Sequence, residues 1–182
     1  MFHNPRIRVI CGCMSSGKSK TLMARITPLD HSPHKYQLFT SVIDPEGDVH
    51  CRDGIRHPAI AVENSLELLE RVEPDTVVVA IDEGQFFDHG LVGVVQRLAR
   101  SGRIVYIAGL DLDWEGNPFG PMAGLLAASE HVEKLTAWCT FPGCKATATL
   151  SQRIVANTAQ LDAGQDKYVA RCLTHWDPTK FV

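Results

Sequence analysis

The chain has 182 residues, of which 45% are hydrophobic and 21% are charged. These proportions are typical of a globular protein with one α/β domain and a small appendage. The net charge of −3 and the scattered Lys and Arg residues give no electrostatic reason to expect a nucleic-acid partner. No stretch approaches the ~18–20 apolar residues that cross a bilayer, and residues 1–8 lack the pattern of a signal peptide. We therefore expect a cytoplasmic protein with no nucleic-acid and no membrane partner.

Strands and helices are predicted to alternate along the chain. Short apolar runs predict strands over residues 6–11, 37–43, 76–81, 103–110 and 132–138. Helical spacing and turn residues predict helices over residues 17–29, 64–72, 91–101 and 122–129. Either Asn64 or Ser65 is expected to cap the second helix, and residues 44–58 are expected to form a loop. This alternation predicts right-handed crossovers and a mostly parallel sheet.

A complete phosphate-binding motif follows the first predicted strand and opens the first predicted helix. It consists of Gly12, Cys13, Met14, Ser15, Ser16, Gly17, Lys18 and Ser19. Glycines let the backbone curl so that its N–H groups face phosphate oxygens, and the helix adds its positive N-terminal end. Lys18 would reach the β- and γ-phosphates of ATP, and Ser19 would offer its hydroxyl to Mg²⁺. Chance matches to four fixed positions are rare, so the motif predicts nucleotide binding.

Two carboxylates end the most apolar predicted strand. Asp82 and Glu83 follow residues 77–81, and an Asp at this place in P-loop proteins holds Mg²⁺. Because successive strand side chains point to opposite sides, Glu83 can serve another task, such as accepting a proton from a hydroxyl or orienting a water. Gly84 is expected to let the chain turn away from the strand. The plainer alternative is a pair of solvated charges.

Four residues near the C-terminus have the spacing of a zinc site. Cys139 and Cys144 form one pair, and Cys172 and His175 form the other. Three thiolates and one imidazole suit a tetrahedral structural Zn²⁺, whereas a disulfide frame is not expected in an intracellular chain. The alternative is ordinary buried thiols beside a surface histidine. The other three cysteines lack such partners and are expected to be structural: Cys11, Cys13 and Cys51.

These motifs, in this order and spacing, resemble the zinc-containing thymidine kinases along nearly the whole chain. Beyond the phosphate loop, the matching residues are 82–87, 110–111, 118–120, 151–153, Gly164, Tyr168, Cys172 and His175. The stretch Asp-Glu-Gly-Gln-Phe-Phe over residues 82–87 is the most specific part of the match. The resemblance implies an α/β fold of the P-loop NTPase (RecA-like) type over residues 1–137. It further implies a small zinc-binding, nucleoside-gripping subdomain over residues 138–182.

The resemblance also implies a reaction and roles for its residues. ATP would phosphorylate the 5′-hydroxyl of deoxythymidine in a homotetramer, with Glu83 as general base and with Asp82 and Gln85 near ATP and Mg²⁺. Apolar and aromatic walls would enclose the flat base, and a loop would grip its edges through backbone groups. The nucleoside would contact Met14, Phe86, Trp114, Phe119, Leu161, Asp162, Ala163, Gly164, Gln165 and Tyr168.

The sequence departs from the family pattern at several positions that bear on substrate range and rate. Trp114 replaces the usual Phe, and Glu46 stands where the family has an Arg that helps to hold phosphates; the nearby Arg52 can partly compensate. Asp162 and Ala163 depart from the usual pattern of the gripping loop. These changes leave the phosphate motif and the expected fold intact.

Two other classes of function fit parts of the sequence. A P-loop ATPase or nucleic-acid motor would use Glu83 to activate water, but it would normally show a basic groove or a longer chain with further catalytic arginines. A zinc-stabilised nucleotide-binding module without catalysis would lack Lys18 or Glu83, and both are present. The sequence therefore favours the kinase.

Overall fold

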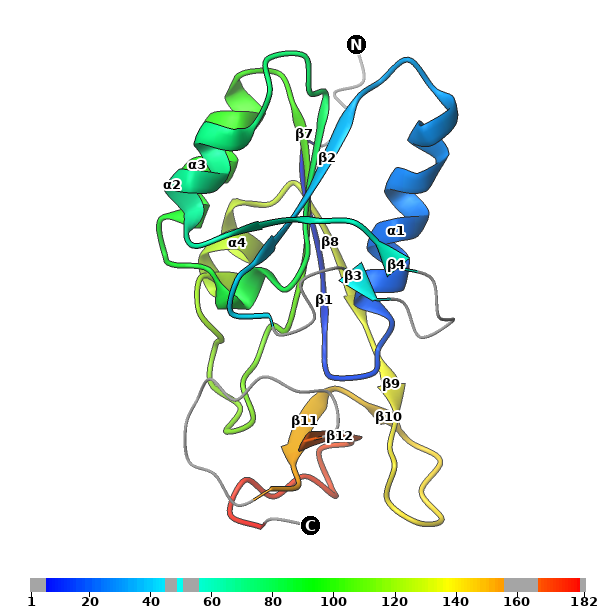
Figure 1. Ribbon diagram of the computed structural model, residues 1–182. Coiled ribbons are helices and arrows are strands. Elements are labelled where there is room, and N and C mark those ends of the chain that lie inside the picture. Colours follow the sequence, from blue (N-terminus) through cyan, green and yellow to red (C-terminus); the bar gives the residue numbers. More distant parts are fainter. Residues whose placement is uncertain (1–5, 45–48, 51–55, 156–166, 181–182) are drawn as a thin grey trace.

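A six-stranded parallel sheet forms the centre of the protein, with strand order β5-β2-β6-β7-β1-β8 (Figure 1). The computed structural model describes residues 6–44, 49–50, 56–155 and 167–180. The strands of the sheet are β1 (Ile7–Gly12), β2 (Tyr36–Ser41), β5 (Ile60–Val62), β6 (Val78–Ile81), β7 (Ile104–Gly109) and β8 (His131–Leu135). The predicted α/β fold with a mostly parallel sheet is confirmed.

Helices cover both faces of this sheet (Figure 1). On one face lies α1 (Lys18–Ile26), followed by a short 3₁₀ helix, η1 (Thr27–His31). The other face carries α2 (Ser65–Arg71), α3 (Leu91–Arg100) and α4 (Met122–Ala128). The Asn64 side chain accepts hydrogen bonds from the backbone N–H groups of Leu66 and Glu67, so Asn64 and not Ser65 caps α2. All four predicted helices are confirmed.

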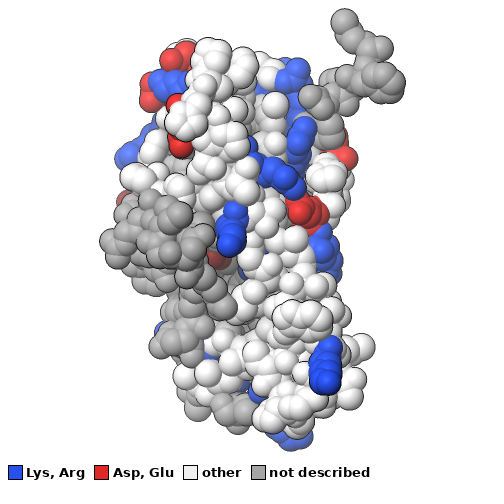
Figure 2. Space-filling view, turned by 90° about the vertical axis from the view of Figure 1, so that its right-hand side faces the viewer, with Lys and Arg blue, Asp and Glu red and all other residues white. Residues whose placement is uncertain are grey.

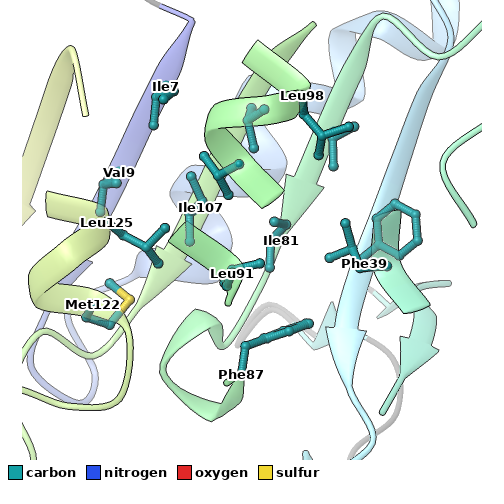
Figure 3. Close-up of a cluster of buried hydrophobic side chains, with 14 of the residues drawn as sticks. Ile7, Val9, Phe39, Ile81, Phe87, Leu91, Leu98, Ile107, Met122 and Leu125 are labelled. Carbon is teal, nitrogen blue, oxygen red and sulfur yellow. The ribbon is translucent and has the colours of Figure 1, made fainter. Parts of the chain in front are cut away.

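Strand side chains alternate between two hydrophobic clusters, one on each face of the sheet. Val9, Ile81 and Ile107 point toward α3 and α4, where they pack against residues such as Leu91 and Met122 (Figure 3). Their neighbours in sequence, Ile10, Ala80 and Ala108, pack on the opposite face against Leu22 and Ile26 of α1. Each fully buried side chain of this size contributes roughly 1.5–3 kcal/mol to folding. The two clusters therefore hold the carboxyl ends of the strands in fixed positions.

Three parts of the fold differ from the sequence-based prediction. The edge strand β5 was not expected, because its three residues follow Pro58 and are too short for a clear pattern. The expected loop over residues 44–58 contains two paired short strands, β3 (Val49–His50) and β4 (Arg56–His57). The last predicted strand is two strands, since β8 ends at Leu135 and β9 (Ala137–Trp138) pairs elsewhere.

The C-terminal part contains two small antiparallel ribbons beyond the carboxyl end of β1 (Figure 1). In one, β9 pairs with β10 (Thr147–Ala148), and in the other β11 (Leu150–Arg153) pairs with β12 (Tyr168–Arg171). The phosphate-loop residue Cys13 is buried against both ribbons, and its thiol donates to the carbonyl of Ala148 at 3.3 Å. This contact, which was not predicted from the sequence, joins the loop to the C-terminal part.

The surface gives no sign of a single dominant charge on the face that Figure 2 shows, where basic and acidic side chains are scattered among uncharged ones. Within the described ranges, no helix is long and apolar enough to cross a membrane. The expected cytoplasmic location stays a prediction.

Candidate active site and metal centre

The phosphate loop connects β1 to α1 in a conformation that its glycines permit. Gly12 has φ of 144° and Gly17 has φ of 88°, and Ser15 also has a positive φ, of 65°. A Cβ atom on Gly12 would lie 2.3 Å from the carbonyl oxygen of Leu135, which excludes any other residue. The loop therefore curls tightly against the end of the neighbouring strand, and the N-terminus of α1 opens toward it.

Lys18 and Ser16 lie in this loop with unused hydrogen-bonding capacity. Lys18 is buried, and its ammonium donates to the carbonyl of Cys13 at 3.0 Å, which leaves two further N–H donors. The buried hydroxyl of Ser16 has no hydrogen-bond partner among the described residues. Buried polar groups are normally satisfied, so these donors fit a bound phosphate chain.

Asp82 lies directly after β6, buried beside the phosphate loop. It accepts hydrogen bonds from the hydroxyl of Ser19 and, at 3.0 Å, from the backbone N–H of Glu83. Burial raises the pKa of Asp82, and the charge of Glu83 raises it further, to about 7. The Ser19 hydrogen bond and the Lys18 charge lower this pKa only in part. A carboxylate that is buried and costly to ionise, next to a hydroxyl, fits a cation that would replace the proton.

Glu83 is turned away from the strand by its own backbone. The sequence suggested that strand alternation sets the direction of the Glu83 side chain. It does not, because β6 ends at Ile81, before Glu83. Glu83 itself has φ of 49°, a left-handed conformation that is strained for this residue. Gly84 begins the 3₁₀ turn over Gly84–Phe86, as expected, but the left-handed backbone conformation belongs to Glu83 and Gly84 does not need one. Gly84 is needed instead for close packing, since a Cβ atom there would lie 2.8 Å from the Cγ2 of Ile107.

Gln85 fixes the Glu83 carboxylate in place. Gln85 is buried, and its amide nitrogen donates to one carboxylate oxygen of Glu83. Its amide oxygen accepts from the backbone N–H of Leu110 at 2.9 Å, which ties the turn to the end of β7. Neither pattern nor spacing indicated this bracing role, because a glutamine in a turn is common in exposed positions as well.

Most of the predicted nucleoside-binding residues that the structure describes fall into two aromatic groups. Phe86 and Phe119 meet edge to face, with ring centroids 6.0 Å apart. Trp114 is carried by a tight hairpin, in which the Asp113 carboxylate accepts from the backbone of Glu115 and Asn117. Met14 follows Cys13 in the phosphate loop and is tied to β11, because its backbone N–H donates to the Ser151 hydroxyl at 3.0 Å.

Trp114 and Tyr168 are brought together by an arginine whose role was not predicted from the sequence. Arg153 is fully buried, and its guanidinium lies over the Trp114 ring at 4.4 Å and over the Tyr168 ring at 5.4 Å. It also donates to the Tyr168 hydroxyl at 2.8 Å. Such cation–π contacts are strongest when they are shielded from water. Arg153 belongs to residues 151–153, which match the family pattern, but that match alone did not assign it a contact or a role.

The four predicted zinc ligands converge. Their donor atoms all lie within 4.8 Å of one another, with 3.2 Å between the Cys172 thiol and His175 Nδ1 and 4.0 Å between the Cys144 and Cys172 sulfurs. Ligands of a tetrahedral Zn²⁺ at thiolate distance are separated by about 3.8 Å, so this donor set fits that ion. Tight turns place both pairs, since Cys144 N–H donates to Phe141 O and His175 N–H to Cys172 O, each at 3.0 Å.

A comparison with protein families agrees with this arrangement. The family model described as thymidine kinase matches residues 5–176. The chain belongs to the thymidine kinase family. This thymidine kinase is therefore a nucleoside phosphotransferase whose substrates are ATP and thymidine.

Several predicted residues of this kinase lie outside the described residues. They are Leu161, Asp162, Ala163, Gly164 and Gln165 of the expected gripping loop, together with Glu46, Cys51 and Arg52. The other predicted site residues of the kinase are all described: the phosphate loop, the two carboxylates, Gln85, the aromatic groups, Tyr168 and the four metal ligands.

Cys139, which directly follows β9, has surroundings that favour its ionised thiolate form. Burial raises the pKa of Cys139, but backbone hydrogen bonds from Cys172 and Phe141 and side-chain contacts with His175 lower it to about 6. The ring of His175 stacks on that of Phe141, with centroids 4.0 Å apart and an interplanar angle of 1°. A thiolate and an oriented imidazole are the forms in which these groups ligate Zn²⁺.

Proposed function

We propose that this kinase transfers the γ-phosphate of ATP to the 5′-hydroxyl of deoxythymidine with Glu83 as general base. The supporting observation is the contrast between two adjacent carboxylates, because Asp82 is buried beside Ser19 and Lys18 whereas Glu83 is half-buried and braced by Gln85. Only Glu83 has both an exposed face and a fixed orientation. It is therefore the carboxylate that suits proton transfer to and from a substrate.

The proposed step conserves atoms and charge. Glu83 accepts the proton of the 5′-hydroxyl while that oxygen forms a bond to the γ-phosphorus. The bond between the γ-phosphorus and the bridging oxygen of ATP breaks, and the electron pair leaves with ADP. Lys18 and the backbone N–H groups of the phosphate loop stabilise the charge that builds up on the phosphoryl oxygens. Mg²⁺, held by Ser19 and Asp82, would neutralise further phosphate charge when bound.

The nucleoside would lie between the phosphate loop and the aromatic groups. Met14, Phe86, Phe119 and Trp114 supply apolar walls suited to a flat base, and Tyr168 supplies a hydroxyl whose position Arg153 fixes. The loop of residues 161–165 would grip the base edges.

The remaining assignments concern the architecture. We propose that Cys139, Cys144, Cys172 and His175 hold a structural Zn²⁺ that stabilises residues 138–182 as a unit beside the nucleotide-binding part, residues 1–137. The close approach of the four donor atoms supports this assignment. The resemblance to the zinc-containing thymidine kinases also supports a homotetramer.

One experiment tests the proposed substrate. ADP release is measured with ATP alone and with ATP plus each of the common deoxynucleosides. The proposal expects rapid ADP release with deoxythymidine and little without a nucleoside. Rapid ADP release from ATP alone would instead support a P-loop ATPase.

A further inference from the structure

A cavity of ≈ 370 Å³ lies in the C-terminal part, on the side of the second ribbon that the active site does not use. Among its lining residues are Phe141, Gln152, Arg171, Asp177 and Lys180. This volume is in the range of about 300–1,000 Å³ that is common for small-molecule sites. None of the residues that we place around ATP or the nucleoside lines it.

Gln152 gives the cavity a fixed wall. This side chain is almost fully buried, and its amide nitrogen donates to the carbonyls of Asp177 at 2.7 Å and Lys180 at 2.6 Å. Its amide oxygen accepts from the backbone N–H of Asp177 at 2.8 Å. Three hydrogen bonds from one buried side chain thus fasten the last described turn to β11, so the wall is part of the folded structure.

Arg171 brings a positive charge into this cavity without a matching negative charge. The residue is only 6% exposed, donates to the Thr140 hydroxyl and lies over the Phe141 ring at 5.9 Å. In the part of the chain that the structure describes, no carboxylate forms an ion pair with Arg171. A guanidinium has five N–H donors, and burying its charge without an anion is costly.

Neither the Asp177 carboxylate in the cavity lining nor the metal-ligand thiols pair with Arg171. The Asp177 carboxylate pairs with Lys180 at 2.8 Å and accepts a hydrogen bond from the Thr179 hydroxyl at 2.6 Å. The metal-ligand thiols lie on the other side of β12, because Ala170 and Cys172 pack into the thiol cluster and the residue between them points away. The positive charge of Arg171 therefore remains for a ligand.

We propose that this cavity binds a small organic anion, whose phosphate or carboxylate group pairs with the Arg171 guanidinium. Arginine forms paired, charge-assisted hydrogen bonds with either group. The Phe141 ring, which is 45% exposed, forms an apolar wall beside Arg171 and suits a flat or apolar part of the same ligand. The site is separate from the transfer reaction and does not depend on the proposed role of Glu83.

Phenyl phosphate, benzoate and inorganic phosphate are suitable probes, with phenol as an uncharged control. Each is titrated by calorimetry into the zinc-loaded protein saturated with deoxythymidine and a non-hydrolysable ATP analogue, so that the active site is occupied. We expect saturable binding of at least one organic anion, with a dissociation constant of about 1 mM or lower. The affinities for phenyl phosphate and benzoate show whether the site prefers a phosphate or a carboxylate group. The affinity for inorganic phosphate, which has no ring, shows whether the phenyl ring of the probe contributes to binding. Absence of saturable binding by every anion would overturn the proposal.

Variants locate the binding. Arg171→Gln should weaken it by about tenfold or more, because a charged hydrogen-bonding partner is lost, and Arg171→Lys should restore part of the affinity. Arg100→Gln, which removes an exposed arginine at the end of α3, is the matched control and should bind as the wild type does. Equal affinity in Arg171→Gln and wild type would contradict the proposal. Should Arg171→Gln fail to fold, the wild-type and Arg171→Lys titrations still decide the question.

Discussion

Asp82 and Glu83 are adjacent in sequence and have different surroundings. Asp82 is buried and hydrogen-bonded to Ser19, whereas Glu83 is half-buried, has a left-handed backbone conformation and is held by Gln85. Two carboxylates whose surroundings give them different proton affinities commonly have different roles in an active site. In this kinase one carboxylate is suited to a cation and the other to a proton.

The buried carboxylate gives a prediction about pH. In the folded protein the pKa of Asp82 is about 7, above its ordinary value of 3.8, so the folded state binds this proton more tightly than the unfolded state. The stability that Asp82 contributes is therefore present below about pH 4 and is lost as the pH rises to about 7. The free energy of unfolding of the wild type, compared with that of Asp82→Asn, should therefore fall between about pH 4 and pH 7. Above about pH 7 the difference between the two proteins should stay constant. Urea unfolding of both proteins at several pH values measures this, and a difference that is independent of pH would contradict it.

Lys18 provides a second prediction at this scale. Its buried ammonium is positioned in the phosphate loop, where loss of one preorganised donor commonly slows turnover by about 100-fold or more. Lys18→Ala should show such a loss in ADP formation, and Ser19→Ala should also be impaired. Lys20→Ala, which changes an exposed lysine two residues further along α1, is the matched control and should keep its activity. A Lys18→Ala enzyme with most of its turnover would refute the phosphate-loop assignment.

At the scale of elements, one side chain links two of them. Gln85 joins the turn after β6 to the backbone at the end of β7, and Gly120 approaches so closely that a Cβ atom there would lie 2.3 Å from the Gln85 carbonyl oxygen. The hairpin that carries Trp114 and Phe119 thus docks on the turn that carries Glu83. The base-binding walls and the proposed base share one support.

Gln85→Ala should disturb both stability and catalysis. It leaves the buried backbone N–H of Leu110 without its partner, a loss that commonly costs about 1–3 kcal/mol, and it frees the Glu83 carboxylate. We expect lower stability in urea unfolding and a lower turnover number. Gln96→Ala on α3 is the control for removal of a glutamine outside the active site. Unchanged turnover in Gln85→Ala would show that Glu83 needs no bracing.

The elements differ in how well the sequence predicts them. The strands that end at the phosphate motif and at Asp82 are short, mainly apolar runs directly beside recognisable motifs, so their place in the fold follows from local pattern. The strand Ile60–Val62 is recognisable only through its pairing with β2, and pairing is a property of the whole sheet. For the same reason the contact of Cys13 with Ala148 and the stacking of Arg153 on Trp114 could not be predicted, since they join residues far apart in sequence.

At the scale of the whole molecule, the proposed metal centre and the proposed active site share structure. Cys13 of the phosphate loop packs in one cluster with Cys139 and Cys172, and β12 begins at Tyr168 and leads directly to Cys172. The phosphate loop connects β1 and α1 of the main sheet layer, whereas β12 pairs with β11 and is tied to the metal-ligand segment by two hydrogen bonds from Thr140 to the Ala170 carbonyl. Loss of zinc should therefore loosen the C-terminal part more than the loop.

Elemental analysis should find one Zn²⁺ per chain in freshly purified protein. After chelation, thermal stability should fall, and affinity for deoxythymidine should fall more than affinity for ATP. Re-addition of Zn²⁺ is the control and should restore both. Metal-free protein from a gentle purification, or full stability after chelation, would contradict the zinc assignment.

The central claim is that Glu83 takes a proton from the nucleoside, and one comparison tests it most directly. ADP formation is measured in wild type and Glu83→Gln, each with and without deoxythymidine. The substitution nearly preserves shape and hydrogen bonding but removes the base, so turnover with deoxythymidine should fall on the order of 100-fold or more while substrate binding changes little. The wild-type enzyme should release ADP when deoxythymidine is present and should release little ADP when it is absent. Unimpaired turnover in Glu83→Gln would contradict the role of that residue, and nucleoside-independent ADP release by the wild type would contradict the kinase mechanism itself.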